Sequence, residues 1–306
     1  MTYHSPRAIE SAAKEAAKKS PLETSRALTL FWWDRFLTRV FSSDEPEFVL
    51  KGGMSMLARM GSRFTKDIDL ATEAENIDSA QSRLIELVSR DLGDFFHFEF
   101  ISAEPITIAN TNLTGRRLGF SVIIGGAERG RIRVDLVSGC NPVGFAEVVA
   151  PAHRLSVKGL VVSDYYLYPL VDTLADKICA TLAPRSHNRG SSRTKDLVDI
   201  ISIAQTAEFD ACELATALNI TLAQQGVARP QFFSIPQSWK TGGHNSQYRK
   251  LAQEASLSAP LDTVEVAERY AREMIDPILS HQIVDGIWNP ISQQWENHKI
   301  RRTEHE

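Results

Sequence analysis

The segment RGRIRVDLVSG, residues 129–139, alternates charged and branched apolar side chains at successive positions. Neighbouring side chains on a β-strand point to opposite faces, so this alternation predicts a strand with one buried face. The buried face would hold Ile132, Val134 and Leu136. The other face would hold Arg131, Arg133 and Asp135. A strand of this kind needs partner strands and a covering layer, so the chain must fold around a sheet.

The rest of the sequence divides into two parts with different patterns. Strand-forming segments occur in the first part at 47–53, 67–71, 96–104 and 116–125. Helices are expected there at 5–43, where Pro21 separates two of them, and at 54–60 and 76–92. After Pro151 the apolar residues recur at helical spacing, which predicts helices at 168–183, 194–209, 210–225 and 261–279. We therefore expect an α+β protein with a short mixed sheet in a first domain, residues 1–150, and a mainly helical second domain, residues 151–306.

Composition excludes several classes of protein. The chain has 306 residues, and no stretch approaches the roughly eighteen apolar residues that a membrane helix needs, so no membrane partner is expected. The N-terminal region lacks the apolar segment of a secretory signal, which predicts a cytoplasmic protein. Three widely spaced cysteines predict neither a disulfide framework nor a CxxC metal site.

One segment of the chain is strongly basic. A net charge of −4 argues against extended coating of nucleic acid, because such binding rests on many phosphate contacts. Contact would therefore be local, and PRSHNRGSSRTK at 184–195 is the candidate segment, a solvated loop being the alternative. Its basic residues are Arg185, Arg189, Arg193 and Lys195.

Two aspartates lie on one face of the strand predicted at 67–71. Asp67 and Asp69 are separated by one residue, so both carboxylates point the same way. Hard divalent cations such as Mg²⁺ or Mn²⁺ take oxygen ligands and leave room for substrate phosphates. A DxD sequence alone is common by chance, and a salt-bridged surface turn is the alternative. The signal is stronger here because Gly52 and Gly53 precede a helix, where exposed backbone N–H groups could receive a triphosphate.

Asp135, on the polar face of the strand at 129–139, can add a third carboxylate. In two-metal phosphoryl transfer, one ion stabilises the leaving group and the other activates the attacking hydroxyl. The glycine turn, the Ser55 hydroxyl nearby and three acids together predict a site for a nucleoside triphosphate and a divalent metal.

Several of these segments resemble those of a known family. The run LKGGMSML…SRFTKDIDL, the strand RVDLVSG, and LADKICA followed by RTKDLVDI resemble the AbiEii-type nucleotidyltransferase toxins, including the MenT-like ones. The resemblance spans residues 45–205 and implies a polymerase-β-like nucleotidyltransferase core, with the helical second domain closing the active-site cleft. It also implies a toxin of a toxin–antitoxin pair, with a cognate antitoxin protein. The implied reaction adds a nucleotide, often a pyrimidine, to the 3′ end of tRNA, which blocks aminoacylation and translation.

The resemblance also implies roles for individual residues. Metal would be bound by Asp67, Asp69 and Asp135, and the nucleotide phosphates by Gly52, Gly53, Ser55 and Lys177. Asp199 matches a later acidic position of the family, while Asp196 is expected to cap the start of its helix. RNA would be contacted by Arg185, Arg189, Arg193 and Lys195, with Arg131 and Arg133 as further candidates. Thr65 lies where some relatives carry a phosphorylated serine, and a phosphate there would place negative charge beside the metal ligands.

Three other functions remain open on the sequence. The same metal site could transfer a nucleotide to a small molecule such as an aminoglycoside, or to a protein hydroxyl. An acidic acceptor pocket would favour an aminoglycoside, and a basic rim would favour RNA. The chain could instead bind GTP or another NTP without turnover, although three acids are more than such a protein needs. A DxD glycosyltransferase is a further alternative, but the short helix between the glycines and the aspartates does not suit it.

Overall fold

We analysed a computed structural model, which describes residues 3–43, 45–108, 113–183 and 193–297. The chain forms two compact units, and each is described by itself. The first unit ends at Tyr168, and the second begins at Pro169 but also takes in the short segment Pro142–Phe145. The boundary expected at 150/151 therefore falls inside the first unit, because the strand Tyr165–Leu167, which follows it, belongs to the sheet of that unit.

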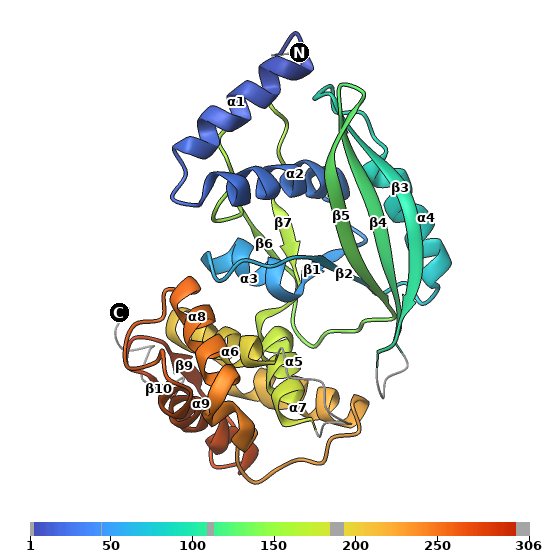
Figure 1. The fold of residues 1–306 in the computed structure, drawn as a ribbon. Coiled ribbons are helices and arrows are strands. Elements are labelled where there is room, and N and C mark those ends of the chain that lie inside the picture. The colour runs from blue at the N-terminus through green and yellow to red at the C-terminus, as the bar shows by residue number, and fades with distance from the viewer. Residues whose placement is uncertain (1–2, 44, 109–112, 184–192, 298–306) are drawn as a thin grey trace, which may run out of the picture. The chain divides into compact units, whose positions relative to one another are not determined.

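The first unit contains four helices and seven strands among the described residues (Figure 1). The helices are α1 (Pro6–Lys18), α2 (Thr24–Val40), α3 (Gly52–Met60) and α4 (Ile77–Val88). The first strands are β1 (Val49–Lys51), β2 (Ile68–Thr72), β3 (Phe96–Ile106) and β4 (Thr114–Ile124). The last are β5 (Ala127–Ser138), β6 (Glu147–Val149) and β7 (Tyr165–Leu167).

Capping side chains fix the starts of three of these helices. The Ser5 hydroxyl accepts a hydrogen bond from the Ala8 N–H ahead of α1, and Asn76 does the same for two N–H groups of α4. The Glu23 carboxylate caps α2. Pro21 lies between α1 and α2, which confirms the prediction of two helices before residue 43.

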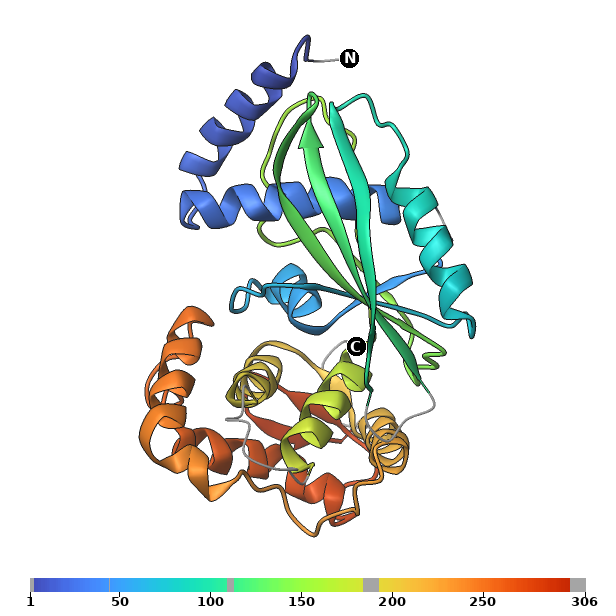
Figure 2. The ribbon, with the colours of Figure 1, turned by 45° about the vertical axis from the view of Figure 1, so that its right-hand side comes forward.

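The seven strands form one mixed sheet in the order β3-β4-β5-β2-β1-β7-β6. The pairs β2·β5 and β1·β7 are parallel, and the others are antiparallel. A mixed sheet is confirmed, but β3, β4 and β5 have 11, 11 and 12 residues and are longer than predicted. Helix α2 crosses one face of this sheet (Figure 2). There the ring centroid of Phe36 lies 5.3 Å from that of Phe98 and 5.2 Å from that of Phe120.

A buried ion cluster joins α2 to the start of β3. Asp94 Oδ1 lies 2.7 Å from Arg39 Nη2, and Asp94 Oδ2 lies 2.7 Å from Arg35 Nη2. The side chains of both arginines are fully buried, and that of Asp94 is 2% exposed. Burial disfavours the charged carboxylate, but the hydrogen bonds and positive charges of Arg39 and Arg35 outweigh it and lower the pKa of Asp94.

The second unit is mainly helical, as predicted, but it also contains a small sheet. Its helices are α5 (Leu170–Leu182), α6 (Thr194–Thr206), α7 (Ala211–Gln224), η1 (Gln237–Lys240), α8 (Gly242–Glu254) and α9 (Val264–Leu279). Its strands, in the order β10-β9-β8, are β8 (Phe209–Asp210), β9 (Ile287–Asn289) and β10 (Gln294–Glu296). This sheet, η1 and α8 were not expected from the sequence.

Two buried contacts organise the second unit. The indole N–H of Trp288 on β9 donates a 2.7 Å hydrogen bond to the Ala204 carbonyl of α6, which ties the small sheet to the helices. On α5, the Asp172 carboxylate accepts hydrogen bonds from the backbone N–H groups of Val143 (2.8 Å) and Gly144 (3.0 Å). The segment Pro142–Phe145 is held in this unit by that carboxylate.

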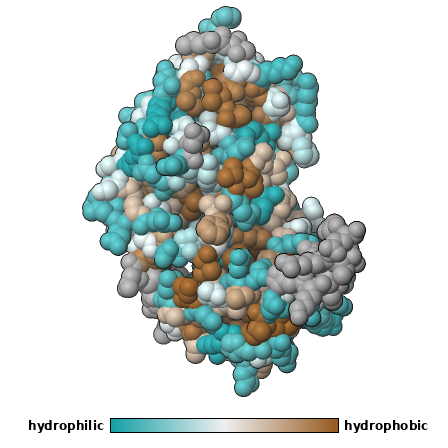
Figure 3. Space-filling view, turned by 180° about the vertical axis from the view of Figure 1, so that it is seen from behind, coloured by the Kyte–Doolittle hydropathy of each residue, from teal (hydrophilic) through white to brown (hydrophobic). Residues whose placement is uncertain are grey.

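No helix among the described residues is both long enough and apolar enough to cross a bilayer. Figure 3 shows one face of the molecule, on which hydrophobic residues form separate patches between hydrophilic ones. Two of the most exposed large apolar side chains, Phe145 and Ile291, are far apart in the sequence.

Candidate active site

One row of charged residues crosses the first unit's sheet. Lys51 on β1 pairs in register with Asp69 on β2, and Asp69 pairs with Asp135 on β5. Asp135 pairs in turn with Arg117 on β4, and Arg117 with Glu104 on β3. Residues directly opposite each other on paired strands point to the same face. Two adjacent carboxylates are therefore flanked by one cation on each side.

The strand alternation that gives this row is as predicted. Ile68 and Leu70 of β2 have no exposed surface, and neither do Val134 and Leu136 of β5. Asp69 and Asp135 lie between these buried residues and are partly exposed. The parallel pairing of β2 and β5 thus brings together two acids that lie far apart in the sequence.

The glycine turn lies directly against Asp69. Gly52 has a φ of +62°, and a Cβ atom added there would be 2.0 Å from Asp69 Oδ2. A Cβ atom added to Gly53 would be 2.8 Å from the Thr65 hydroxyl oxygen. Both glycines therefore let the start of α3 approach the loop and strand that carry Thr65 and Asp69. Lys51, the residue before α3, makes no side-chain cap hydrogen bond to the first turn, and the N–H groups of a helix start are suited to binding phosphate.

Ser55 lies in the same turn but is completely buried. Its hydroxyl donates a 2.9 Å hydrogen bond to the Gly52 carbonyl, which supports the turn itself. A direct contact between Ser55 and a phosphate stays a prediction, as does modification of Thr65, whose side chain is half-buried beside Gly53.

Asp67 offers an oxygen without a hydrogen bond. Its Oδ1 atom is buried and has no hydrogen-bond partner among the described residues. Arg133 Nη1 lies 3.7 Å away, which is an ion pair but too long for a hydrogen bond. A buried carboxylate oxygen without a hydrogen bond, beside a second carboxylate and a glycine cradle, fits a hard divalent cation.

Asp135 is held by Arg117. The Arg117 Nε and Nη2 atoms donate hydrogen bonds of 2.7 Å each to Asp135 Oδ1 and Oδ2. Hydrogen bonding to Asp135, together with the charges of Asp135, Asp67 and Glu104, raises the pKa of Arg117 despite partial burial. Within the part of the chain that the structure describes, no three acidic, histidine or cysteine side chains are grouped closely enough to hold one metal ion. Of the predicted set, Asp69 and Asp135 are paired in register, Asp67 lies just before β2, and Asp135 is bound by an arginine.

The second unit contains a buried lysine with two acidic partners. On α5, Lys177 Nζ lies 2.9 Å from Asp199 Oδ2 and 3.2 Å from Asp196 Oδ1, both on α6. The Asp199 side chain has no exposed surface. Arg193 is the N-cap residue of α6, so Asp196 is not the cap that was expected; it lies in the first turn and binds Lys177. Contact between Lys177 and a triphosphate stays a prediction.

The predicted basic segment is only partly described. Arg185 and Arg189 lie outside the described residues. The Arg193 guanidinium donates a hydrogen bond to the Ala180 carbonyl, whereas Lys195 is exposed on α6. A role for any of the four in RNA binding stays a prediction.

Two residues of the site were missed in the sequence. Arg117 belongs to the predicted strand at 116–125, but nothing in its local pattern indicates which residue it faces across the sheet. Lys51 ends β1, and its Nζ atom lies 3.8 Å from the centroid of the Tyr168 ring. The signal that could have found Arg117 is the strand alternation at 116–125, which places it on the face opposite Leu118 and Phe120.

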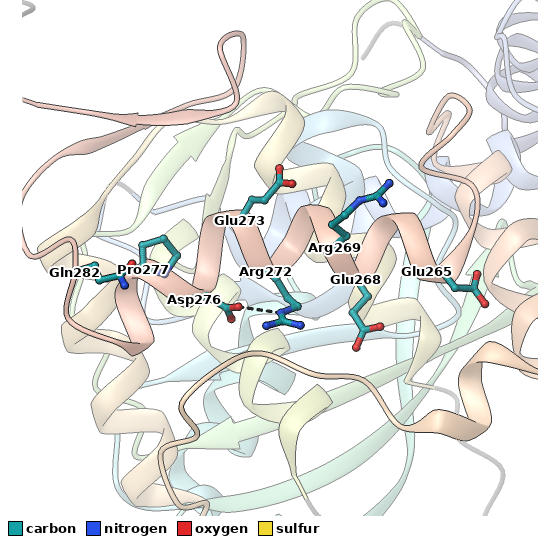
Figure 4. A pocket seen from close by; sticks show the side chains of 8 residues that line it. All are labelled: Glu265, Glu268, Arg269, Arg272, Glu273, Asp276, Pro277 and Gln282. Carbon is teal, nitrogen blue, oxygen red and sulfur yellow. Dashed lines mark hydrogen bonds and ion pairs between the residues drawn. The ribbon is translucent and has the colours of Figure 1, made fainter.

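A pocket along α9 in the second unit is lined by none of the predicted site residues (Figure 4). Its volume is about 570 Å³, and its lining is mostly charged. Arg272 Nε binds Asp276 Oδ2 at 2.9 Å, and Glu268 Oε2 binds Lys240 Nζ at 2.6 Å. The same two carboxylates hold the segment 232–240 against α9. The Phe233 N–H donates a hydrogen bond to Asp276, and the Ile235 N–H donates one to Glu268.

Comparison with known proteins places this geometry in a family. The family model described as nucleotidyl transferase AbiEii toxin, type IV toxin–antitoxin system, matches residues 35–283. No curated protein matches the chain.

A solved structure agrees on the fold. MenT4, a nucleotidyltransferase toxin from Mycobacterium tuberculosis H37Rv, is similar with 15% identity and a TM-score of 0.50, over 89% of this chain and 98% of that chain. At this identity the likeness shows the fold alone. JHP933 from Helicobacter pylori is also found, with 13% identity and a TM-score of 0.43, over 85% of this chain and 96% of that one. Because the family match covers most of its length, the chain belongs to the AbiEii nucleotidyltransferase toxins of type IV toxin–antitoxin systems.

Proposed function

We propose that this toxin transfers a nucleoside monophosphate, a pyrimidine in its preferred reaction, from an NTP to the 3′ end of tRNA in the cytoplasm. Family membership supports the NTP substrate and an antitoxin partner. The proposal adds the acceptor, the choice of base and dependence on Mg²⁺ or Mn²⁺. Blocked aminoacylation and halted translation would be its toxic effect.

The observation that carries the RNA acceptor is the basic rim of the acidic site. On the polar face of β5, Arg131 and Arg133 continue the line of Asp135, with side chains 73% and 60% exposed. Their neighbours on β4 are small, since Arg133 pairs with Gly119 and Arg131 pairs with Ser121. Exposed guanidinium groups with small neighbours are accessible to the phosphates of an RNA backbone. An aminoglycoside would instead need an acidic acceptor pocket.

The chain's own residues have distinct tasks in this reaction. Asp67, Asp69 and Asp135 would hold the cation, which when bound neutralises triphosphate charge and makes the acceptor hydroxyl more acidic. The N–H groups at the start of α3 would receive the phosphates, with Gly52 and Gly53 permitting close approach. In the second unit, Lys177 would contact the triphosphate, and ion pairs with Asp199 and Asp196 hold its ammonium group in place.

The test is a labelling assay with each of the four α-labelled NTPs, total RNA, and Mg²⁺ or Mn²⁺. The purified toxin is compared with Asp69→Asn and with Glu86→Gln, a control that neutralises an exposed carboxylate on α4. We expect label in tRNA-sized product with the parent and with Glu86→Gln. Asp69→Asn loses one cation ligand. We expect its activation free energy to rise by at least about 3 kcal/mol, which lowers the labelling rate about a hundredfold.

Other outcomes would replace the proposal. Label in a small molecule or in protein would identify a different acceptor. Retained NTP binding without label in any acceptor would identify a nucleotide-binding protein without turnover. Equal labelling by Asp69→Asn and the parent would show that the acid row is not the catalytic site.

A further inference from the structure

The pairing of Asp135 with Arg117 has a consequence for metal binding. Asp135 is the neighbour of Asp69 in register and the natural third oxygen donor of the site. Yet both of its oxygens accept hydrogen bonds from one guanidinium, each 2.7 Å long. A bidentate arginine–carboxylate pair is among the stronger polar contacts in proteins, so a cation must compete with it.

We infer that Arg117 is a positioning residue that serves as the counter-ion of Asp135 in the metal-free toxin, and that it exchanges this carboxylate for a phosphate group when cation and nucleotide bind. The inference rests on the proposed function, because it concerns the same acid row. Three observations carry it.

The first observation is the distribution of charge in the row. Without a cation, the Asp69 and Asp135 carboxylates are neighbours on adjacent strands, which lie about 4.8 Å apart, and their charges repel. Lys51 flanks this pair on the Asp69 side and Arg117 on the Asp135 side. Arg117 therefore relieves the same repulsion that a divalent cation would relieve.

The second observation is the difference in exposure between the partners. The Arg117 side chain is 40% exposed, whereas that of Asp135 is 17% exposed. The guanidinium can thus move into solvent, while the carboxylate stays on the strand beside Asp69. A partly exposed ion pair contributes little to stability, so a divalent cation can displace the arginine.

The third observation is the chemistry of the released group. A guanidinium fork binds phosphate with the same geometry that it uses for carboxylate. Once Asp135 turns to the cation, the freed Arg117 lies on the face that carries Arg133 and Arg131, where the proposed RNA backbone would run. One residue would therefore stabilise the empty site and then assist substrate binding.

The test separates the bidentate contact from simple charge by using Arg117→Lys, which keeps the positive charge but loses the fork. Arg129→Lys is the matched control, because Arg129 lies on the same strand as Asp135 but uses its guanidinium fork to bind Glu10 on α1, outside the acid row. The first measurement is the affinity for Mn²⁺ alone, determined from the free Mn²⁺ signal in electron paramagnetic resonance. We expect Arg117→Lys to bind Mn²⁺ several-fold more tightly than the parent, and Arg129→Lys to bind it as the parent does.

The second measurement is the kinetics of RNA labelling. In Arg117→Lys, the half-saturating Mn²⁺ concentration should fall while the KM for NTP or RNA rises. A merely damaged site would raise both values, so the opposite directions identify an exchange of partners.

Equal Mn²⁺ affinity of Arg117→Lys and the parent would overturn the inference, and if the parent still labels RNA the proposed function stands. If the parent neither binds Mn²⁺ nor labels RNA, the proposed function fails and the inference fails with it. An Arg129→Lys variant that tightens Mn²⁺ binding as much as Arg117→Lys would also overturn it, because the effect would then not depend on the contact between Arg117 and Asp135.

Discussion

Replacing Gly52 by alanine should separate the approach of the glycine turn to Asp69 from ordinary backbone strain. The new Cβ atom would lie 2.0 Å from Asp69 Oδ2, whereas ordinary contact begins at 3.4 Å. The carboxylate oxygen must therefore retreat by about 1.4 Å. A shift of about 1 Å in a catalytic group costs about a hundredfold in rate, so we expect at least that loss of RNA labelling.

The same substitution also carries a cost in stability. Gly52 has a φ of +62°, in the left-handed region where an L-residue loses about 1–2 kcal/mol. Gly126, in the turn between β4 and β5, provides a control, because its φ is +83° and an added Cβ atom would meet nothing within 4 Å. Gly126→Ala should therefore lose a similar free energy of unfolding in urea and keep its labelling activity.

The comparison of these two variants can refute the reasoning. If Gly52→Ala labels RNA as fast as the parent, then close approach of the turn to Asp69 is not needed for catalysis. If Gly126→Ala loses as much activity as Gly52→Ala, then backbone strain, and not the displaced carboxylate, accounts for the loss.

Two further predictions concern the buried ion cluster and Thr65. Asp94→Asn leaves two buried arginines without their carboxylate, so the free energy of unfolding should fall by about 3–5 kcal/mol in a urea titration. The folded pKa of Asp94 is lowered, so the cluster stabilises the parent fully above the unfolded pKa of about 3.9, and this stability should be lost as pH falls through the folded pKa. A parent protein whose acid unfolding matches that of Asp94→Asn would contradict this assignment. Thr65→Glu should place negative charge beside Gly53 and weaken NTP binding at least tenfold. NTP affinity is measured by titration, with Thr65→Val as the uncharged control. Full activity of Thr65→Glu would argue against control by phosphorylation.

Local pattern was enough to predict the strand faces of the acid row. The alternation at 131–136 places Asp135 on the polar face because neighbouring side chains on a strand must diverge, and no tertiary information is needed for that. The pairing of Asp69 with Asp135, and of Asp135 with Arg117, depends on how distant strands align. Register of this kind is set by the whole sheet, so a single sequence could not supply it.

The second unit shows a different limit of sequence patterns. Its strands β8, β9 and β10 have only two or three residues, too few for a period of two to be recognised. Helix α8 begins with two glycines and has a polar composition, so its sequence looked like a loop. Tertiary contacts stabilise these elements, including the burial of Tyr248 of α8 and Trp288 of β9.

The hydrogen bonds that Asp172 accepts from Val143 and Gly144 affect how the toxin can be divided for experiments. The segment Pro142–Phe145 precedes β6 and β7 in the chain, yet it belongs with the helices that start at Pro169. A fragment that begins at residue 169 would lack this segment and expose the carboxylate that it satisfies. No single cut in the polypeptide yields both units intact, so a circular permutation or a linked insertion is the suitable route to an isolated second unit.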